Sequence, residues 1–333
     1  MKLSIIVPAF NAVKILENTI STAYAQKLEE HQFEVIIIDD GSNDSTYDLA
    51  LSLASKRTNC IVIHQENKGL GGARNTGIKV ARGTYICFLD ADDFLIENSL
   101  NTLFDLASQF NLDVLEFGAR GVSIAGHVIY EYKNHSSQVL DGLSYYKSIR
   151  YMNSACNKLY KRSFLLENQL FFLERIFIED YEFNTRIFIK AEKVYATSLI
   201  GAEFVQSANS ITRNKEVSKK QKMLHDIFEV ISIINSDFKV VEQTQNESQK
   251  AFYLERLNFL VVTLFFQLFK MNSPIADCVF WKNKLKIQGM WYVYNSIYDR
   301  KKFVFKLLLI FFPLFLLLVF VKGNISRLFS IEN

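Results

Sequence analysis

The chain has 333 residues, enough for one large or two ordinary domains with a sizeable core. Its 38 Lys and Arg residues against 35 Asp and Glu give a net charge of +3, which offers no argument for binding nucleic acid. The four cysteines lie far apart and are typical of reduced core thiols in a cytosolic protein, not of a disulfide framework or a zinc site. The first apolar run reaches a proline almost at once, so we expect a first β-strand there and no signal peptide.

The first 90 residues alternate between β-rich runs and helical patterns. Apolar, β-rich runs predict strands at residues 2–7, 33–38, 60–64 and 85–89. Helical patterns follow the first three strands, at residues 13–28 and 45–53 and in the stretch that ends near Ala81. This alternation predicts an α/β fold, with a doubly wound, mostly parallel sheet and helices on both faces. Polar loops follow three of the strands at one edge of the sheet, where open α/β sheets bind ligands.

The rest of the chain is expected to add further strands and then a helical region. Helices are expected at residues 99–110, 145–153 and 181–191, strands at 113–117 and 194–200, and a hairpin at 122–132. Residues 215–272 have a helical pattern, and their polar stretch at 242–250 predicts a break between two helices.

Three carboxylates follow the fourth predicted strand within four residues. Asp90 and Asp92 are one residue apart, so their side chains can converge on a single divalent ion. Hard oxygen ligands of this kind suit Mg²⁺ or Mn²⁺, which commonly bridge to substrate phosphates. The alternative is a solvated acidic turn in which Asp92 or Asp93 caps the next helix.

Residues 67–75 form a glycine-rich loop before the third predicted helix. A dinucleotide fingerprint would follow the first strand and would have a third glycine where Arg74 stands. A P-loop would need a Gly-Lys-Ser/Thr sequence, which is missing here. Lys68 and Arg74 can still bind phosphate at a helix N-terminus, although Lys68 could equally be a solvated loop charge.

Four motifs in this order resemble the family 2 glycosyltransferases, which are inverting enzymes of the GT-A fold. The motifs are Ser-Ile-Ile-Val-Pro-Ala-Phe-Asn at 4–11, Val-Ile-Ile-Ile-Asp-Asp-Gly-Ser-Asn-Asp at 35–44, Asn-Lys-Gly with Ala-Arg-Asn-Thr-Gly within 67–77, and Asp-Ala-Asp-Asp at 90–93. Asn-Lys-Leu-Tyr at 157–160 and Glu-Asp at 179–180 resemble acceptor-side segments of the family. The resemblance covers about residues 1–200 and implies a nucleotide-sugar donor, with a UDP-sugar favoured.

The resemblance also implies which residues bind the nucleotide. The residues expected there are Pro8, Ala9, Phe10, Asn11, Asp40, Lys68, Arg74, Asp90 and Ala91. The Phe10 ring would pack on uracil, and Asp40 would accept a hydrogen bond from uracil N3–H. Asp39 is the alternative to Asp40, but we expect it only to cap or orient the loop.

The same resemblance assigns the metal ligands and the base. Asp92 would ligate Mg²⁺ or Mn²⁺ at the diphosphate, and Asp90 would reach the ribose or the metal's water shell. Asp180 would be the general base for the acceptor hydroxyl, with Glu179 as the alternative. A single base is enough because direct displacement at the anomeric carbon inverts its configuration.

The end of the chain carries an uninterrupted apolar run from Leu307 to Val321 that contains Pro313. Lys and Arg residues at 300–306 precede the run, which favours a membrane-associating tail with the enzyme on the cytoplasmic face of the cell membrane. The run is short for a full span, so spanning and re-entrant arrangements both stay open, and a buried core helix is the alternative.

These patterns together predict an organisation and a function. We expect a GT-A catalytic domain at residues 1–212 with a nucleotide-binding half at 1–95 and an acceptor half at 96–212, a helical region at 213–299 and the tail at 300–333. The predicted function is a metal-dependent, inverting glycosyltransferase acting on a glycan or lipid-linked glycan acceptor. A catalytically silent sugar-nucleotide-binding scaffold would show no turnover, and a nucleotidyltransferase would release pyrophosphate rather than UDP.

Overall fold

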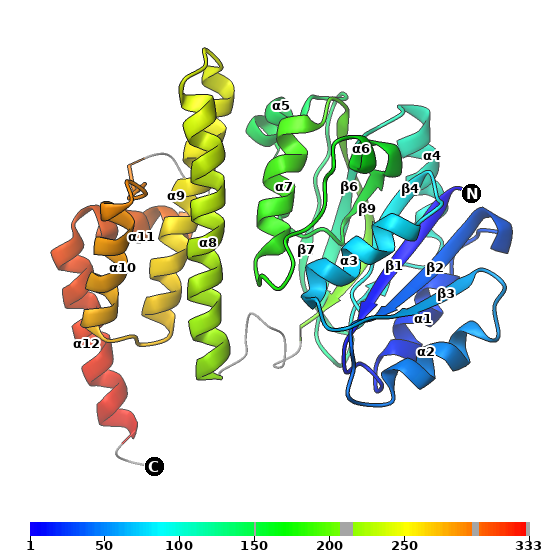
Figure 1. Cartoon of the computed structure of the whole chain (residues 1–333), viewed down its shortest axis with the longest axis horizontal. Helices are drawn as coiled ribbons and strands as arrows, with labels where there is room; N and C mark the ends of the chain where they lie inside the picture. Colours follow the sequence, from blue (N-terminus) through cyan, green and yellow to red (C-terminus); the bar gives the residue numbers. More distant parts are fainter. Residues whose placement is uncertain (150, 207–215, 295–299, 331–333) are drawn as a thin grey trace. The chain divides into compact units, whose positions relative to one another are not determined.

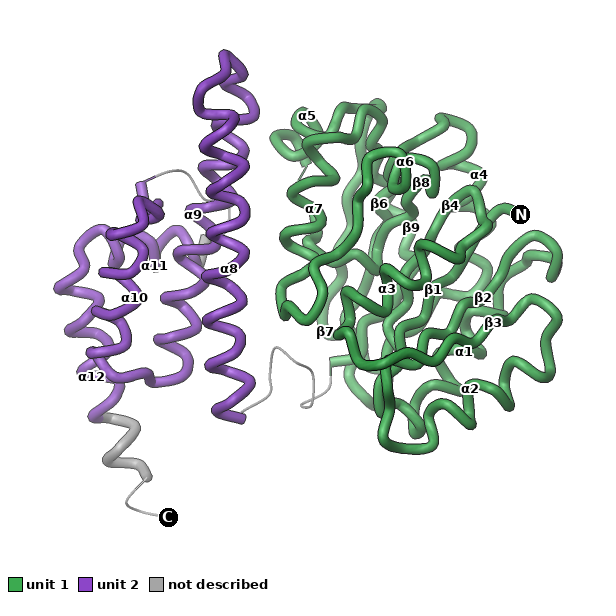
Figure 2. The backbone as a smooth tube through the Cα atoms, viewed as in Figure 1, with its two compact units in different colours: residues 1–213 green, residues 214–333 purple. Residues whose placement is uncertain are grey.

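The computed structural model describes residues 1–149, 151–206, 216–294 and 300–330 (Figure 1). The chain divides into two compact units, unit 1 at Met1–Arg213 and unit 2 at Asn214–Asn333 (Figure 2). The domain boundaries expected at residues 212 and 299 lie outside the described residues. Unit 1 holds a mixed α/β sheet, and the described part of unit 2 is built from helices.

In the described part of unit 1, a nine-stranded sheet forms the centre, in the order β3-β2-β1-β4-β8-β6-β9-β5 with β7 paired to β6. The first four strands are parallel, namely β1 (Leu3–Ala9), β2 (Phe33–Asp39), β3 (Cys60–His64) and β4 (Tyr85–Phe88). The others are β5 (Phe94–Leu95), β6 (Val114–Val122), β7 (Val128–Tyr132), β8 (Lys158–Lys161) and β9 (Val194–Val205). The predicted α/β class is confirmed, but the sheet is mixed because β5, β7 and β8 run against the other strands.

Helices cover both faces of the sheet. They are α1 (Leu16–Tyr24), α2 (Thr46–Ala54), α3 (Gly69–Val80), α4 (Ser99–Gln109), α5 (Gly142–Ser148), α6 (Arg162–Glu167) and α7 (Glu179–Lys190), with a 3-10 turn at Glu30–Gln32. Alternate residues of a strand point to opposite faces, so Ile5 and Val7 of β1 join a buried cluster with α1 and α4. Ile6 faces α3, which lies so close that a Cβ on Gly77 would be 2.3 Å from the Ile6 Cγ2 atom.

Strand β1 runs further than predicted, past Pro8 to Ala9. Strand β4 pairs with β1 only as far as Ile6, so Pro8, which has no N–H to donate, lies beyond that ladder. The β2 strand accompanies β1 to its end and brings Asp39 level with Ala9. The loops that follow β1 and β2 therefore begin side by side.

The helix predicted at residues 145–153 is wrong in both bounds. Helix α5 begins at Gly142 because the Asp141 side chain caps it, accepting from the N–H groups of Leu143 and Ser144 at 3.0 Å. It ends at Ser148, and residues 151–154 are not helical. The strands predicted at 113–117 and 194–200 are also longer, because β6 and β9 pair along most of their length.

Unit 2 contains the two long helices predicted within residues 215–272. They are α8 (Val217–Glu242) and α9 (Glu247–Lys270), followed by α10 (Ile275–Ile287), α11 (Arg300–Ile310) and α12 (Phe312–Ser330). The predicted break between the first two is confirmed. Asn246 caps α9 by accepting a hydrogen bond from the Gln249 N–H at 3.0 Å.

The apolar run at residues 307–321 forms a bent pair of helices, with 112° between Lys302–Ile310 and Phe312–Asn324. Pro313 stands in the first turn of α12, where its missing N–H costs no helical hydrogen bond. Phe305 and Phe315 are buried, and the Phe315 ring packs 5.7 Å from that of Phe265 in α9. The tail is therefore partly a core element of unit 2.

Other side chains of the same run are exposed. Phe311 is 62% exposed, and Leu314, Leu317 and Phe320 are each more than half exposed, as is Val304 just before the run. Among the described residues, α9 alone is long and apolar enough to cross a membrane, with 61% of its most apolar window buried inside the unit, and the bent pair would be a second crossing if it counted as one span.

Candidate active site

The carboxyl ends of β1 and β2 form the first part of a site at one edge of the sheet. The Asn11 N–H donates to Ser42 Oγ at 2.9 Å, and the Asn43 N–H donates to Asn11 Oδ1 at 2.8 Å, so the two loops hold each other. Asn11 has a φ of 50°, a left-handed conformation that asparagine tolerates better than most residues. In the loop after β1, Phe10 is 49% exposed, whereas the preceding residues Pro8 and Ala9 are buried.

Asp39 and Asp40 have separate environments although they are adjacent. Asp39 is fully buried and its Oδ2 lies 2.6 Å from His64 Nδ1. Asp40 Oδ1 accepts from Gln65 Nε2 at 2.7 Å and from the Lys68 N–H at 2.8 Å. Among the described residues, no side chain or amide donates to Asp40 Oδ2, so this oxygen is the one that can accept from a ligand.

The glycine-rich loop approaches its own chain closely. A Cβ on Gly71 would lie 2.2 Å from the Leu173 carbonyl oxygen, so this position in α3 accepts only glycine without a shift. Asn75 and Phe172 exchange two hydrogen bonds, of 2.9 and 2.7 Å. The segment at residues 171–175 therefore covers the start of α3. The Lys68 side chain is exposed there, while its backbone N–H binds Asp40.

Arg74 is the centre of the site, with 1% of its side chain exposed. Its Nη2 atom lies 2.9 Å from Asp90 Oδ1, and its Nη1 atom lies 2.5 Å from Asp180 Oδ1 and 2.9 Å from Glu179 Oε1. The guanidinium also lies over the ring of Phe172, 5.1 Å from its centre. These three carboxylates raise the pKa of Arg74, although burial alone would lower it. One cation thus joins the loop after β4 to the start of α7.

The acidic loop after β4 holds side chains with different degrees of exposure. Asp90 is 28% exposed, and the Ala91 carbonyl accepts from Thr19 Oγ1 at 2.7 Å. Burial, and then the charge of Asp90, raises the pKa of Asp92. Asp93 is buried and accepts from the Val205 N–H at 2.8 Å, and burial raises its pKa to about 9. Asp93 therefore ties this loop to the end of β9.

The fit of a divalent ion depends on Asp90 and Asp92. Within residues 1–149, 151–206, 216–294 and 300–330, no group of three or more His, Cys, Asp or Glu side chains is placed to hold a metal ion. Mg²⁺ is usually held by one or two carboxylates that leave the other positions to substrate phosphates and water. A pair of neighbouring carboxylates fits that kind of site.

Asp180 and Glu179 begin α7, and they differ in exposure. Asp180 is 25% exposed, with Arg74 at Oδ1 and the Ala155 N–H donating to Oδ2 at 3.0 Å. Glu179 is 8% exposed at its side chain, and burial followed by the charge of Asp180 raises its pKa to about 8. The more exposed carboxylate of the two is Asp180, which suits a base that meets a substrate.

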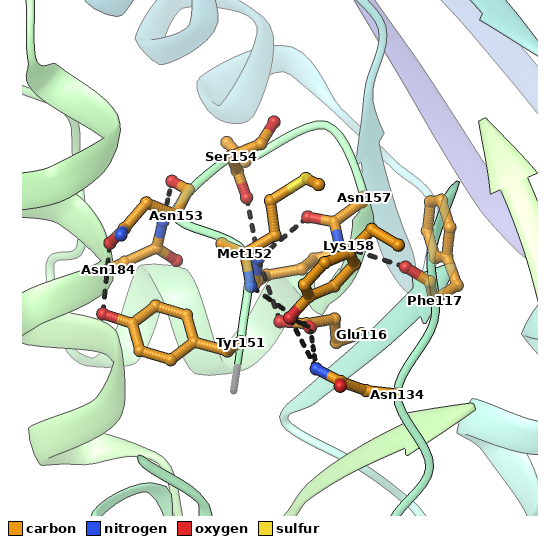
Figure 3. Close-up of polar contacts among 12 residues, drawn as sticks. Glu116, Phe117, Asn134, Tyr151, Met152, Asn153, Ser154, Asn157, Lys158 and Asn184 are labelled. Atoms are coloured by element: carbon orange, nitrogen blue, oxygen red, sulfur yellow. Dashed lines mark hydrogen bonds and ion pairs between the residues drawn. The ribbon is translucent and has the colours of Figure 1, made fainter. Parts of the chain in front are cut away.

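Sequence reasoning missed a buried ion pair beneath the same edge. Lys158 and Glu116 are opposite residues of β8 and β6, with 3.2 Å between Lys158 Nζ and Glu116 Oε2 (Figure 3). The available signals were one Glu inside the apolar run at 113–117 and the Lys of the Asn-Lys-Leu-Tyr motif. Pairing them requires knowing that β8 lies beside β6.

The sequence profile of glycosyl transferase family 2 matches residues 4–167, which include the ends of β1, β2 and β4. The chain carries a family 2 glycosyltransferase domain. The predicted family is confirmed by this match, and the sheet order brings the loops that carry its motifs to one edge.

Similar proteins support this family assignment. The domain is 34% identical over 198 residues to the uncharacterized glycosyltransferase EpsJ of Bacillus subtilis, which covers 57% of this chain and 57% of EpsJ. The Escherichia coli UDP-Glc:alpha-D-GlcNAc-diphosphoundecaprenol beta-1,3-glucosyltransferase WfaP is 27% identical over 67% of this chain and 86% of WfaP. The crystal structure of S. aureus TarS 1–349 in complex with UDP-GlcNAc has a TM-score of 0.64 at 22% identity, covering 87% of this chain and 78% of that one. The last likeness shows a common fold.

Proposed function

We propose that this glycosyltransferase-family chain transfers a sugar from a UDP-sugar to an acceptor hydroxyl with inversion. The observation that carries the proposal is the pair of contacts made by Arg74, which joins Asp90 after β4 to Asp180 at the start of α7. A donor-side carboxylate, Asp90, and a candidate base that is one quarter exposed, Asp180, are thus held by one guanidinium.

The uridine would bind between the ends of β1 and β2. The exposed Phe10 ring offers a stacking surface, and Asp40 Oδ2 is the oxygen that would accept from uracil N3–H. Pro8, Ala9 and Asn11 would border the uridine from the β1 side. TarS, which has the same fold, was crystallised with UDP-GlcNAc, and this supports the choice of a UDP-sugar.

The diphosphate would bind at Asp90, Ala91 and Asp92 with Mg²⁺ or Mn²⁺. These carboxylates would hold the ion, whose charge supports departure of the nucleoside diphosphate. Asp90 is also held by Arg74, so its orientation is fixed before the donor binds. Lys68 extends from the neighbouring loop and would add a further positive charge.

Asp180 would accept the proton of the acceptor hydroxyl during the displacement. Its Oδ1 and Oδ2 atoms are oriented by Arg74 and by the Ala155 N–H, and a quarter of the side chain stays open to solvent. Glu179 would assist by holding Arg74 in place rather than by taking this proton.

The acceptor would be a glycan or a lipid-linked glycan at the cytoplasmic face of the cell membrane. WfaP, whose name gives a diphosphoundecaprenol-linked acceptor, covers two thirds of this chain. The exposed apolar side chains of α11 and α12 would lie on the bilayer, next to the basic residues at 300–306.

The function is tested with a panel of UDP-, GDP- and dTDP-sugars, in Mn²⁺ and in EDTA. A bound donor at 100 times its Kd should stabilise the protein by about 2.7 kcal/mol, which thermal unfolding detects. We expect stabilisation by a UDP-sugar with Mn²⁺ and release of free UDP on turnover. Binding without any turnover would favour the silent scaffold, and pyrophosphate release would favour a nucleotidyltransferase. Equal binding with and without EDTA would refute the metal's role.

The membrane contact is tested on vesicles of phosphatidylcholine and phosphatidylglycerol. The triple variant Phe311→Ser/Leu317→Ser/Phe320→Ser should lower vesicle binding by at least about 10²-fold, because each buried apolar side chain is worth about 1.5–3 kcal/mol. The matched control is Ile124→Ser/Ile287→Ser, at positions 80% and 86% exposed outside the run, which should leave binding unchanged. A wild-type protein that self-associates but does not bind vesicles would show that a second copy covers this face.

A further inference from the structure

The Lys158 ammonium is fully buried and is surrounded by oxygen atoms from one loop. Its Nζ donates to the carbonyls of Met152 at 2.6 Å and of Ser154 at 2.7 Å, and to Asn157 Oδ1 at 2.9 Å (Figure 3). These acceptors all belong to residues 151–157, the acceptor-edge loop, which has no charged side chain of its own. Three N–H groups of one ammonium therefore hold the path of this loop.

Glu116 completes the arrangement from the neighbouring strand. Its Oε2 atom lies 3.2 Å from Lys158 Nζ, and its Oε1 atom accepts from Tyr132 Oη at 2.9 Å, from Asn134 Nδ2 at 3.3 Å and from the Met152 N–H at 3.4 Å. A buried ion pair adds little net stability compared with a well-packed apolar pair. Stability alone is therefore a weak reason for a charge pair here, and its contacts point to the shape of the loop.

The acceptor-edge loop in turn orients the candidate base. The Ala155 N–H donates to Asp180 Oδ2 at 3.0 Å. The Asn184 side-chain amide, one helical turn further along α7, contacts both the Asn153 carbonyl at 2.7 Å and the Asp180 carbonyl at 2.8 Å. The position of the Asp180 carboxylate thus depends on the path of residues 153–155, which Lys158 fixes from beneath.

We propose that Lys158, paired with Glu116, is a positioning residue that holds the acceptor-edge loop so that the Ala155 N–H orients the Asp180 carboxylate toward the acceptor hydroxyl. The inference rests on the proposed function, in which Asp180 is the base. Lys158 acts through the loop and touches no substrate. The half-buried side chains of Tyr151, Asn153 and Ser154 lie on the same loop at the edge of the sheet, so its path also shapes the acceptor side of the site.

The test uses the double variant Glu116→Gln/Lys158→Met in the full chain. Removing both charges together leaves no unpaired ion in the core, and Met is an unbranched side chain only one atom shorter than Lys. Glutamine keeps an oxygen that can accept from Tyr132. Hydrogen–deuterium exchange should then rise at least about 10-fold at the amides of Ala155 and Cys156. UDP release from UDP-GlcNAc and UDP-glucose, with water as the acceptor, should fall by about 10–100-fold in kcat with an unchanged donor KM, because a 1 Å misplacement can cost about 10²-fold.

The matched control is Glu34→Gln, which disturbs another buried carboxylate at the opposite end of the sheet. Glu34 Oε1 accepts from Ser4 Oγ at 2.7 Å and from the Arg82 N–H at 2.6 Å, at the start of β2 and away from Asp40. This variant should lower the melting temperature without changing exchange in residues 151–157 or the kcat for UDP release.

The outcomes separate this inference from the proposed function. Unchanged protection of residues 151–157 in a folded double variant would overturn the positioning role. So would faster exchange in this loop with the wild-type kcat. If the wild-type protein releases no UDP from any donor, the proposed function falls, while the exchange experiment still decides whether Lys158 holds the loop.

Discussion

The loop after β4 and the loop before β8 reach the same edge of the sheet, but they use charge in opposite ways. Residues 90–93 carry three carboxylates of their own and hold Asp90 partly open to solvent. Residues 151–157 carry no charged side chain, and their shape comes from the buried Lys158 beneath them. In the first loop the functional groups are side chains of the loop itself. In the second loop the conformation depends on Lys158 and Glu116, which lie on the paired strands β8 and β6.

The largest expected effect comes from removing Asp92, the carboxylate proposed to hold the ion. Asp92→Ala should reduce turnover to background and abolish Mn²⁺-dependent binding of the UDP-sugar, because the ion proposed at the diphosphate would lose a ligand. The folded state should persist, since a carboxylate at the edge of the sheet contributes little to the core. Isothermal titration with and without Mn²⁺ measures the binding loss. Full Mn²⁺-dependent binding by the variant would assign the ion to other ligands.

The second prediction addresses the acceptor side alone. Asp180→Asn should keep donor binding and lose about 10²–10⁴-fold in kcat, because the amide cannot accept the proton. Glu179→Gln is the matched control and should keep most of the activity. The reverse result, in which only Glu179→Gln is inactive, would move the base to Glu179 and would place both oxygens of Asp180 in a purely structural role.

The third prediction removes the cation that joins the loop after β4 to the start of α7. Arg74→Met should lower the free energy of unfolding by about 3–5 kcal/mol, because the partly buried carboxylates around it lose their common cation. Arg57→Met is the control, since Arg57 pairs with Glu30 at the surface, where such a pair is worth about 0.2–1 kcal/mol. Urea unfolding of the wild type, Arg74→Met and Arg57→Met measures the loss of unfolding free energy caused by each substitution. Equal stabilities would show that the carboxylates are satisfied without Arg74.

The smallest expected effect is a change in melting temperature with pH, which distinguishes Glu179 from the adjacent Asp180 at the start of α7. The pKa of Glu179 is raised to about 8, so the folded state holds a proton that the unfolded chain releases near pH 4.5. The contribution of Glu179 to the free energy of unfolding therefore falls as the pH rises from about 4.5 to about 8. Glu179→Gln should gain in melting temperature relative to the wild type between pH 5.5 and pH 8.5. A constant difference across these pH values would mean that Glu179 is ionised throughout.

The difference between the loops also explains how far the sequence could predict the structure. The strands around Asp40 and Asp90 are local apolar runs with polar residues directly after them, so both the elements and their common edge could be inferred. The helix predicted at 145–153 was wrong because the backbone of Met152 forms hydrogen bonds with Lys158 and Glu116 instead of helical ones. Lys158 and Glu116 meet only because β8 lies between β4 and β6. The sequence near residues 145–153 contains no pattern that predicts this strand pairing.

The contacts of the glycine-rich loop were also beyond the sequence. The sequence allowed only a comparison of its glycines with nucleotide-binding fingerprints, whereas in the structure Gly71 accommodates the carbonyl of Leu173 from the other half of the unit. Likewise, Arg74 was expected at the nucleotide, and its contacts in the structure are with Asp90, Glu179 and Asp180. Whether it also reaches the nucleotide stays a prediction for the donor-binding experiments.

The close approach at Gly71 has a consequence for engineering chimeras. The segment at residues 171–175 rests on α3 with no room for a Cβ, and Asn75 fixes its register through two hydrogen bonds to Phe172. Acceptor halves from related enzymes can therefore be grafted onto this donor half only where their incoming segment fits a bare glycine and offers its main chain to Asn75. Compatibility between a donor half and an acceptor half would thus depend on two positions in α3, Gly71 and Asn75.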